Sequence, residues 1–350
     1  MSRPMAEPDP TLSRPVLVTG GAGYVGSHIA LALLDAGYRV VVADNLCTGL
    51  RWLVPDGACF EEVDLRDGDA LEQILRRHDI GSVVHCAAST VVPDSVADPL
   101  SYYSNNIGAT LSLLGAMARA GVRRIIFSST AAVYRADNAG QPIAEDAPTD
   151  PLSPYGATKL MAERILRDTA AIGALDYTIL RYFNVAGADP DGRAGQSTPA
   201  ATHLIKLACE TACGRRPSLT IYGTDWPTPD GTGVRDFVHV SDLAQAHIMA
   251  LQQGAEAARN RIFNCGYGSG YSVRDVVRAL EAATGTALPV QTAARRAGDL
   301  AQVVADGRAL ADTLGWQPRY ADLNTIIAHS LAWESSHSTP EFHGLSGRPK

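Results

Sequence analysis

The sequence has 350 residues, of which 46% are hydrophobic and 19% charged, an ordinary composition for a globular protein with one large core or two domains. The formal net charge of −7 argues against nucleic-acid binding, and no apolar run approaches the roughly 20 residues that span a bilayer. Six cysteines without paired spacing and nine histidines without a metal-ligand motif predict a reduced, metal-free protein of the cytoplasm.

In chain order, the first predicted segment is a flexible, proline-rich tail over residues 1–14. Apolar runs and helical patterns then alternate as far as residue 185. Strands are predicted over residues 15–20, 39–45, 60–65, 82–88, 124–130 and 177–184, and helices over residues 27–37, 70–79, 99–121 and 157–173. This alternation is typical of an α/β fold, a Rossmann-type doubly wound parallel sheet covered on both faces.

Beyond residue 185 the composition changes to long stretches rich in Gly, Pro, Asp and Thr, with helical patterns over residues 203–214 and 272–285. Long loops in a compact domain are usually functional. We therefore predict a smaller, mostly C-terminal α/β substrate domain over residues 186–335, with some segments that return to the first domain. Residues 338–350 are predicted to form a second flexible tail.

A glycine-rich turn follows the first predicted strand, with Gly20, Gly21, Gly23 and Gly26 in the run VTGGAGYVGSH. Glycines there permit a tight turn, close approach to a pyrophosphate and packing of helix on strand. Asp44 ends the second strand, 18 residues after Gly26. A carboxylate at this place accepts bonds from a ribose and repels a 2′-phosphate, so the pattern predicts NAD rather than NADP.

The run SPYGATKL places Tyr155 four residues before Lys159, one helical turn away on the same face. A neighbouring ammonium and the positive nicotinamide ring, when bound, both favour the phenolate. We therefore expect Lys159 and the cofactor to lower the pKa of Tyr155 toward neutrality and make it a general base. Ser128, Ser129 and Thr130 end a predicted strand at the edge where open α/β sheets bind ligands. A hydroxyl there can hydrogen-bond both the phenol and a substrate hydroxyl and so relay a proton between them. Its alternative role is to cap a turn or a helix.

Seven runs in this order, GGAGYVGSH, ADNLCTG, FSSTAAVY, SPYGATK, RYFNVAGA, DGTGVRDFVHVSDLA and RRAGDLAQVVAD, make the chain resemble the extended short-chain dehydrogenases/reductases. Within them it is similar to the UDP-galactose (UDP-glucose) 4-epimerases, from about Pro15 to about Asp322. The resemblance implies a tightly held NAD⁺, reduced and reoxidised in each turnover, and a 4-keto sugar that rotates before it is reduced on its other face. It also implies a homodimer formed through two long helices, for which residues 112–120 and 158–169 are the candidates.

The resemblance also implies site residues. Tyr155, Lys159 and Thr130 would be catalytic, with Tyr155 taking the proton of the sugar 4-hydroxyl directly or through Thr130. The residues that would bind NAD are Gly20, Gly23, Tyr24, Val25, Gly26, Asp44, Asn45, Asp64, Leu65, Ala87, Asn105, Ser128, Tyr155, Lys159 and Phe183. Those that would bind the UDP-sugar are Thr130, Asn184, His203, Leu204, Tyr222, Arg235, Arg296, Asp299 and Val303. Asp64 has a second interpretation of equal merit, an N-cap of the following helix.

Some positions depart from the family's pattern. Cys86 and Thr90 stand where Phe and a cofactor-contacting Lys are frequent, His203 stands where Asn is frequent, and nothing in the sequence explains Arg135. Val303 stands where a large aromatic residue excludes N-acetylated sugars in some members. We therefore hypothesise that this chain also accepts UDP-N-acetylhexosamines.

Two alternative functions are those of other enzymes, and a third belongs to a different functional class. A nucleotide-sugar 4,6-dehydratase needs acidic residues after Thr130, where this chain has Ala131 and Ala132, whereas a UDP-glucuronate 4-epimerase needs only one further polar partner. A non-catalytic, NAD-binding redox sensor is the alternative of a different class. The presence of Tyr155, Lys159 and a hydroxyl 25 residues before the tyrosine favours an enzyme over a sensor.

Overall fold

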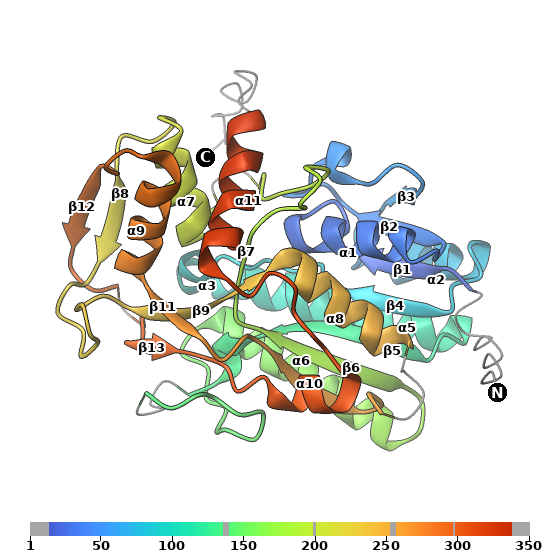
Figure 1. The fold of residues 1–350 in the computed structure, drawn as a ribbon. Helices are drawn as coiled ribbons and strands as arrows, with labels where there is room; N and C mark the ends of the chain where they lie inside the picture. The colour runs from blue at the N-terminus through green and yellow to red at the C-terminus, as the bar shows by residue number, and fades with distance from the viewer. Residues whose placement is uncertain (1–13, 136–139, 199–200, 253–256, 297, 338–350) are drawn as a thin grey trace, which may run out of the picture.

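The larger lobe of the protein is built on a seven-stranded, wholly parallel sheet, as a computed structural model of residues 14–135, 140–198, 201–252, 257–296 and 298–337 shows (Figure 1). Its strands lie in the order β10-β6-β5-β4-β1-β2-β3. Their bounds are β1 Val16–Thr19, β2 Val40–Asp44, β3 Cys59–Glu62, β4 Ser82–His85, β5 Arg124–Thr130, β6 Asp176–Tyr182 and β10 Arg261–Cys265.

The strand order reverses between β1 and β4. From β1 the chain proceeds outward to β2 and β3, and it then returns to β4 and proceeds the other way to β5 and β6. In open α/β sheets, ligands bind in the crevice outside the carboxyl ends of the strands at this reversal. The fold therefore places a ligand crevice beside the residues that follow β1 and β4.

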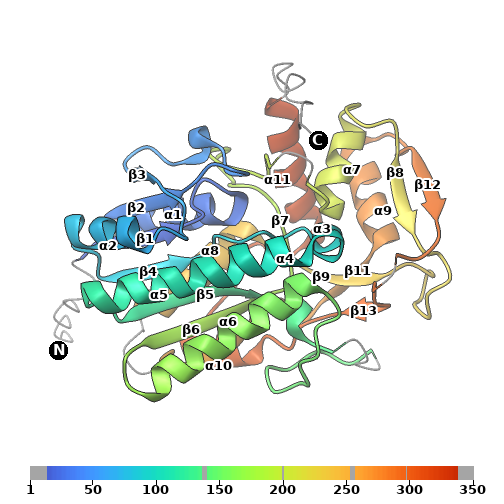
Figure 2. The same cartoon turned by 180° about the vertical axis from the view of Figure 1, so that it is seen from behind.

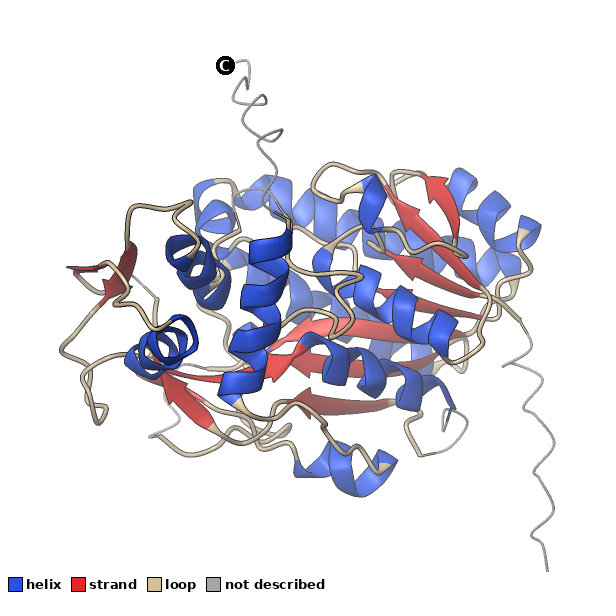
Figure 3. Ribbon diagram, turned by 45° about the horizontal axis from the view of Figure 1, so that its top comes forward, coloured by secondary structure: helices blue, strands red, loops and turns tan. Residues whose placement is uncertain are grey.

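Helices cover both faces of this sheet (Figure 3). On one face α1 packs against α8, and the view from behind shows α2, α5 and α6 on the other (Figure 2). The bounds of the helical segments in this lobe are α1 Tyr24–Asp35, η1 Arg51–Leu53, α2 Gly68–Arg77, α3 Val92–Ala97, α4 Pro99–Tyr102, η2 Tyr103–Ile107, α5 Gly108–Ala120, η3 Ala131–Val133, α6 Pro154–Ala171, α8 Val240–Gln252 and α10 Arg308–Leu314.

Alternate residues of each central strand enter different cores. Leu17 and Ile125 belong to the hydrophobic cluster on one side of the sheet, while Val18 and Ile126 belong to the cluster on the other. A parallel sheet covered on both faces requires such continuous apolar runs. The predicted fold class is therefore confirmed.

The smaller lobe contains a second sheet of β7, β9, β11 and β13 and a ribbon of β8 and β12. It also holds α7, α9 and α11 (Figure 1). The bounds are β7 Asn184–Ala186, α7 Leu204–Ala212, β8 Leu219–Tyr222, β9 Val234–His239, β11 Gly270–Ser272, α9 Val273–Thr284, β12 Val290–Ala293, β13 Gln302–Val303 and α11 Leu323–Ser336.

The structure refines several predicted boundaries. The helix predicted over residues 99–121 is three consecutive segments, α4, the π-helical η2 and α5. Arg14, the last residue of the predicted N-terminal tail, donates from Nε to Asp79 O at 3.1 Å. Residues 1–13 and 338–350 lie outside the described residues. Within the described residues, no helix is long and apolar enough to cross a membrane.

Candidate active site

The glycine-rich turn closes tightly against the two strands at the reversal point. Gly20 has φ of +70°, and a Cβ there would lie 2.7 Å from Ala87 N, just beyond β4. A Cβ on Gly26 would clash with Gly20 O, so the turn requires glycine at both positions. The N-cap of α1, Gly23, makes no side-chain cap bond. The first amides of α1, those of Tyr24, Val25 and Gly26, therefore lack a capping side chain, which suits an anion.

Asp44 ties this turn to the end of β2. Its Oδ2 accepts a hydrogen bond from Ala22 N at 3.0 Å, and its Oδ1 accepts one from Leu46 N at 2.9 Å. Burial raises the pKa of the Asp44 carboxyl, and these backbone bonds oppose the rise. The neighbouring Asn45 accepts a bond from Cys47 N at 3.1 Å in a local turn. The carboxylate predicted to recognise the ribose thus also stabilises the glycine-rich turn through hydrogen bonds.

The structure separates the two interpretations of Asp64. Helix α2 is capped by Asp67, whose side chain accepts from Ala70 N at 3.0 Å. The N-cap interpretation of Asp64 is therefore wrong. The Asp64 carboxylate instead binds Arg66, with Nε to Oδ1 at 3.0 Å, and Leu65 is buried beside it.

The start of α6 explains the run SPYGATKL. Ser153 is the N-cap, with its side chain accepting from Gly156 N at 3.2 Å, and Pro154 occupies the first turn, where a missing N–H costs nothing. A Cβ on Gly156 would clash with Ala132 O. Glycine at this position therefore lets the first turn of α6, which carries Tyr155, approach the segment that follows β5.

The Thr130 hydroxyl lies beside the phenol of Tyr155. Burial raises the pKa of Tyr155 to about 12, and the Thr130 hydrogen bond is the protein interaction that opposes the rise. The ammonium of Lys159 is not among the groups that lower this pKa, contrary to the effect expected from the one-turn spacing. Thr130 Oγ1 also accepts from Ala132 N at 3.1 Å, so the predicted cap function and the contact with Tyr155 coexist.

Lys159 is buried under the end of β5. Its Nζ donates to Ser128 O at 2.8 Å and lies 4.9 Å from the centre of the Phe127 ring. Burial lowers the pKa of Lys159 to about 8, while Cys86 and Glu163 oppose the fall. The lysine is thus held in place by a main-chain carbonyl and an aromatic face rather than by a full ion pair.

Two further predicted cofactor residues are fixed by the protein itself. Asn105, in η2, donates from Nδ2 to Ser89 Oγ at 2.9 Å, and Phe183 is buried with 5% of its surface exposed. The adjacent Asn106 donates to Thr158 Oγ1 at 3.0 Å, which links η2 to the helix that carries Tyr155 and Lys159.

Sequence reasoning missed a buried ion pair behind the end of β5. Arg181 Nη2 donates to Glu163 Oε2 at 2.7 Å, and Ser129 Oγ donates to Glu163 Oε1 at 2.5 Å. Glu163 lies one turn after Lys159, and a charge at this spacing on a helix with apolar neighbours was the available signal. The pair thus also binds the Ser129 hydroxyl.

Sequence reasoning also missed Tyr182 and His247. The Tyr182 hydroxyl lies 2.6 Å from Ser128 Oγ and 2.5 Å from His247 Nε2. Tyr182 lies in the run RYFNVAGA, but His247 lies outside every quoted run. Nothing local connects the two, because the contact joins β6 to α8 across 65 positions of the chain.

Five of the nine predicted UDP-sugar residues lie in or after strands of the smaller lobe: Tyr222 in β8, Arg235 in β9, Arg296 and Asp299 between β12 and β13, and Val303 in β13. The guanidinium of Arg296 lies 3.7 Å from the centre of the Tyr222 ring. Arg235 is paired in register with Val303 across the sheet, and its Nη1 donates to Val234 O and Leu300 O, each at 2.9 Å. Asp299 opposes the fall in the pKa of Arg235 that burial causes.

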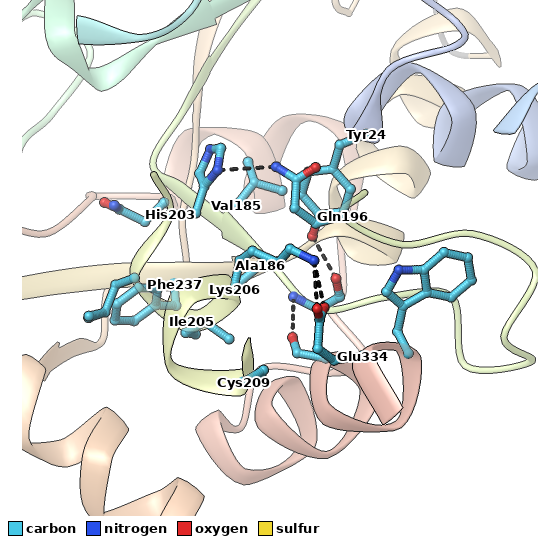
Figure 4. A pocket seen from close by; sticks show the side chains of 15 residues that line it. Tyr24, Val185, Ala186, Gln196, His203, Ile205, Lys206, Cys209, Phe237 and Glu334 are labelled. Atoms are coloured by element: carbon cyan, nitrogen blue, oxygen red, sulfur yellow. Dashed lines mark hydrogen bonds and ion pairs between the residues drawn. The ribbon is translucent and has the colours of Figure 1, made fainter. Parts of the chain in front are cut away.

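Of the other four, Thr130 ends β5, and Asn184, His203 and Leu204 line a pocket between β7, α7 and α11. Figure 4 shows that Gln196 meets His203 in this pocket, with Nε2 to Nδ1 at 3.1 Å. It also shows Lys206 bonded to both oxygens of Glu334, at 2.8 and 2.7 Å. Neither Tyr155 nor Thr130 is among the residues that line this pocket.

Among the described residues, one group of side chains has the types that bind metals. Cys59, Glu61 and His78 bring their ligand atoms within 4.8 Å of one another at β3 and the end of α2. Glu61 already pairs with Arg77 at 2.7 Å and with His78 at 2.6 Å, so its charge is satisfied. This group lies apart from the residues around Tyr155.

Comparisons with known proteins agree with this geometry. Residues 16–266 match the NAD dependent epimerase/dehydratase family. The chain is 52% identical over 342 residues to a UDP-glucose 4-epimerase of Azospirillum brasilense, covering 97% of each. It superposes with a TM-score of 0.88 on UDP-glucose 4-epimerase from Brucella ovis in complex with NAD, at 43% identity and 92% and 98% coverage of the two chains. The UDP-Glc/GlcNAc 4-epimerase from Campylobacter jejuni gives a TM-score of 0.80, with 40% identity and 92% and 99% coverage.

Proposed function

The chain belongs to the NAD dependent epimerase/dehydratase family, and from this premise we propose that it interconverts UDP-glucose and UDP-galactose by epimerisation at C4 with bound NAD⁺. It is thus an isomerase. The observation that carries the proposal is the Thr130 hydroxyl beside the Tyr155 phenol, one helical turn from Lys159, at the carboxyl edge of the parallel sheet.

The residues at the sheet reversal fit a dinucleotide. Gly20 and Gly26 make a turn that no other residue could form, the N-cap of α1 lacks a capping side chain, and Asp44 stands at the end of β2. Gly20, Gly23, Tyr24, Val25 and Gly26 would hold the diphosphate, and Asp44 and Asn45 would hold a ribose. Asp64, Leu65, Ala87, Asn105, Ser128, Lys159 and Phe183 are proposed to complete the site. When bound, NAD⁺ takes up and returns a hydride at the sugar C4 and adds positive charge close to the phenol.

The chain's own residues manage the proton. Tyr155 Oη accepts the proton of the sugar 4-hydroxyl, either directly or through Thr130 Oγ1, and returns it after the sugar has turned. Lys159 keeps its ammonium close to the site through its bond to Ser128 O. Ala131 and Ala132 offer no side chain that can move a proton at C5 or C6, which favours epimerisation over a 4,6-dehydration.

We propose that the smaller lobe holds the UDP-sugar and the larger lobe the NAD⁺. Arginine forks suit a diphosphate, so Arg235 and Arg296 are the candidates for that group. Tyr222, with 36% of its surface exposed, can stack on uracil. Asn184, His203, Leu204 and Asp299 are proposed to complete the nucleotide-sugar site, because they lie in or beside the same lobe.

Val303 bears on the range of sugars. It pairs with Arg235 in the sheet, so its side chain belongs to the proposed substrate lobe. A valine at this position leaves more space than an aromatic ring, and we propose that UDP-N-acetylglucosamine and UDP-N-acetylgalactosamine are also epimerised. The UDP-Glc/GlcNAc epimerase among the structural neighbours shows that this fold accommodates both substrate classes.

We also propose a homodimer. Apolar side chains are exposed on one side of the larger lobe, with Leu100 78%, Leu111 52% and Met161 48% exposed. They belong to α4, α5 and α6, which Figure 2 shows on the face away from α1 and α8. Sedimentation of Leu111→Glu together with Met161→Glu should give monomers, while Val290→Glu in the smaller lobe should leave the assembly unchanged.

The function is tested by incubating the purified protein with UDP-galactose, without added cofactor, and following the anomeric NMR signals of the sugar. UDP-glucose that rises to a constant equilibrium ratio supports the proposal. A deoxy-keto sugar would identify a dehydratase instead. If nothing changes even with NAD⁺ supplied, UDP-glucuronate is the next substrate to test, and inertness to that as well would favour the redox sensor.

A further inference from the structure

Four side chains beside the proposed catalytic residues form one continuous line of polar contacts, here called the Cys86–His247 line. Cys86 Sγ lies 3.1 Å from Ser128 Oγ, which lies 2.6 Å from the Tyr182 hydroxyl. That hydroxyl lies 2.5 Å from His247 Nε2, and His247 Nδ1 lies 2.9 Å from Leu243 O. Ser128 and His247 are buried, with 5% and 0% of their surface exposed. The line joins β4, β5, β6 and α8.

The hydrogen bonds of His247 determine which of its ring nitrogens carries the proton. A main-chain carbonyl can only accept, so His247 Nδ1 must carry the hydrogen that is donated to Leu243 O. Burial lowers the pKa of His247 to about 4, and no carboxylate is among the groups that shift it. The ring is therefore neutral at pH 7, and its single proton is on Nδ1. It follows that Nε2 is unprotonated and accepts from the Tyr182 hydroxyl.

The remaining protons then follow in order. Hydroxyl hydrogens rotate, so each oxygen can donate or accept, but each has only one proton to give. Because the Tyr182 proton goes to His247, the Tyr182 oxygen must accept from Ser128. Ser128 in turn accepts from the Cys86 thiol, which burial keeps protonated by raising its pKa to about 11. The opposite order would require a doubly protonated, buried imidazolium without a counter-charge.

We propose that His247 is a positioning residue. Because it accepts the Tyr182 proton, Ser128 donates its own proton to Tyr182 and cannot give it to Tyr155. Thr130 is then the one hydroxyl of residues 128–130 that can exchange a proton with Tyr155. Ser129 is already committed, because it donates to Glu163 at 2.5 Å. Any group that binds at Ser128 Oγ must therefore act as a donor. This inference deepens the proposed function and rests on it for its catalytic meaning, but the proton order can be measured without turnover.

The first experiment is nitrogen NMR of the NAD-loaded protein labelled with ¹⁵N-histidine. The signals of His247 are identified by their loss in His247→Gln. We expect a neutral ring at pH 7 with the proton on Nδ1, and an Nε2 signal that shifts when Tyr182→Phe removes the donated bond. A proton on Nε2, or an imidazolium at pH 7, would overturn the proton order whether or not the protein is an epimerase.

The second experiment is a double-mutant cycle. Tyr182→Phe and His247→Phe should each lower kcat by about tenfold, and the double variant should lose no more than either single one, because both break the same line. Losses that multiply to about a hundredfold would show that the two residues act separately and would overturn the proposal.

His247→Gln is the conservative variant for this cycle, because its amide oxygen can still accept from Tyr182. It should restore kcat to within about threefold of the unmodified protein, with the KM for the UDP-sugar unchanged throughout the series. If His247→Phe does not fold, the tautomer measurement and the glutamine variant still decide the question. A glutamine variant as impaired as Tyr182→Phe would count against His247.

Discussion

The two sides of the proposed site are held very differently. Around α6 and the end of β5, Lys159 and Ser128 are each bonded to a protein partner, and the Thr130 hydroxyl lies beside Tyr155. On the UDP-sugar side, Arg296 lies across the face of Tyr222, at 3.7 Å, and both residues are exposed. Cation–π contacts at exposed sites contribute only about 0.5–1 kcal/mol. The proton-transfer side is therefore arranged in advance, whereas the contact between Arg296 and Tyr222 on the nucleotide side is free to be exchanged for the ligand.

The largest expected effect tests the prearranged side. Tyr155→Phe removes the proposed base and keeps the ring, so kcat should fall by about 10³-fold, within the range of general-base catalysis. The fraction of protein copies that carry NAD should not change. The measurements are the rate of UDP-galactose conversion and the nucleotide released on denaturation.

Tyr271→Phe, in β11 of the smaller lobe, is the matched control for this substitution and should be fully active. Turnover that survives Tyr155→Phe would mean that another group takes the proton. Loss of bound NAD along with activity would place Tyr155 in cofactor binding instead. The proton-transfer side would then not be arranged independently of the cofactor.

The second prediction concerns the cost of prearrangement at Lys159. Lys159→Met should lower kcat by about 10²-fold. It should also stabilise the nucleotide-stripped protein at pH 7 by about 1 to 3 kcal/mol, because it removes a buried ammonium whose pKa has fallen from 10.5 to about 8.

The difference in stability between the unmodified protein and Lys159→Met should depend on pH. Between pH 8 and about 10.4 the unfolded chain binds more protons at Lys159 than the folded chain does, so the stability of the unmodified protein rises with pH across that window. The stabilising effect of Lys159→Met should therefore be full below pH 8 and disappear above the window. Urea unfolding at pH 7 and pH 10 measures it. A destabilised methionine variant at pH 7 would show that the bond to Ser128 O outweighs the burial of the charge.

The third prediction concerns the nucleotide side. Tyr222→Ala should raise the KM for UDP-galactose by about tenfold and change kcat little, because stacking on a base is worth about 1–3 kcal/mol and is made equally in ground and transition states. Tyr222→Phe keeps the ring and should behave like the unmodified protein. A fall in kcat without a change in KM would mean that Tyr222 shapes the reaction itself.

The same contrast explains how much the sequence predicted. The parallel sheet and the glycine turn were predictable because period, glycine and strand-end residues are local signals. The one-turn spacing of Tyr155 and Lys159 was equally visible. The expected effect of Lys159 on the phenol was not realised, since spacing does not reveal that the ammonium bonds Ser128 O and that burial dominates the pKa of Tyr155.

The contacts that the sequence could not reveal connect distant parts of the chain. His247 lies 65 positions from Tyr182, and Arg181 lies 18 positions from Glu163. Both contacts depend on which strands are neighbours and on which helix covers them. The position of Arg296 on Tyr222 is of the same kind, because it depends on how the loop after β12 returns across β8.

Val303 carries the smallest expected effect and sharpens the comparison, because it lies on the nucleotide side but is fixed in the sheet opposite Arg235. Val303→Tyr fills the space that an acetamido group would need. The ratio of UDP-N-acetylglucosamine turnover to UDP-glucose turnover should therefore fall by about five- to tenfold, the size of a steric penalty of about 1 kcal/mol. Val290→Tyr, on the exposed ribbon, should leave the ratio unchanged. An unchanged ratio in Val303→Tyr would mean that the nucleotide side makes room for the acetamido group even beside a tyrosine. The volume of residue 303 would then not determine which sugar is accepted.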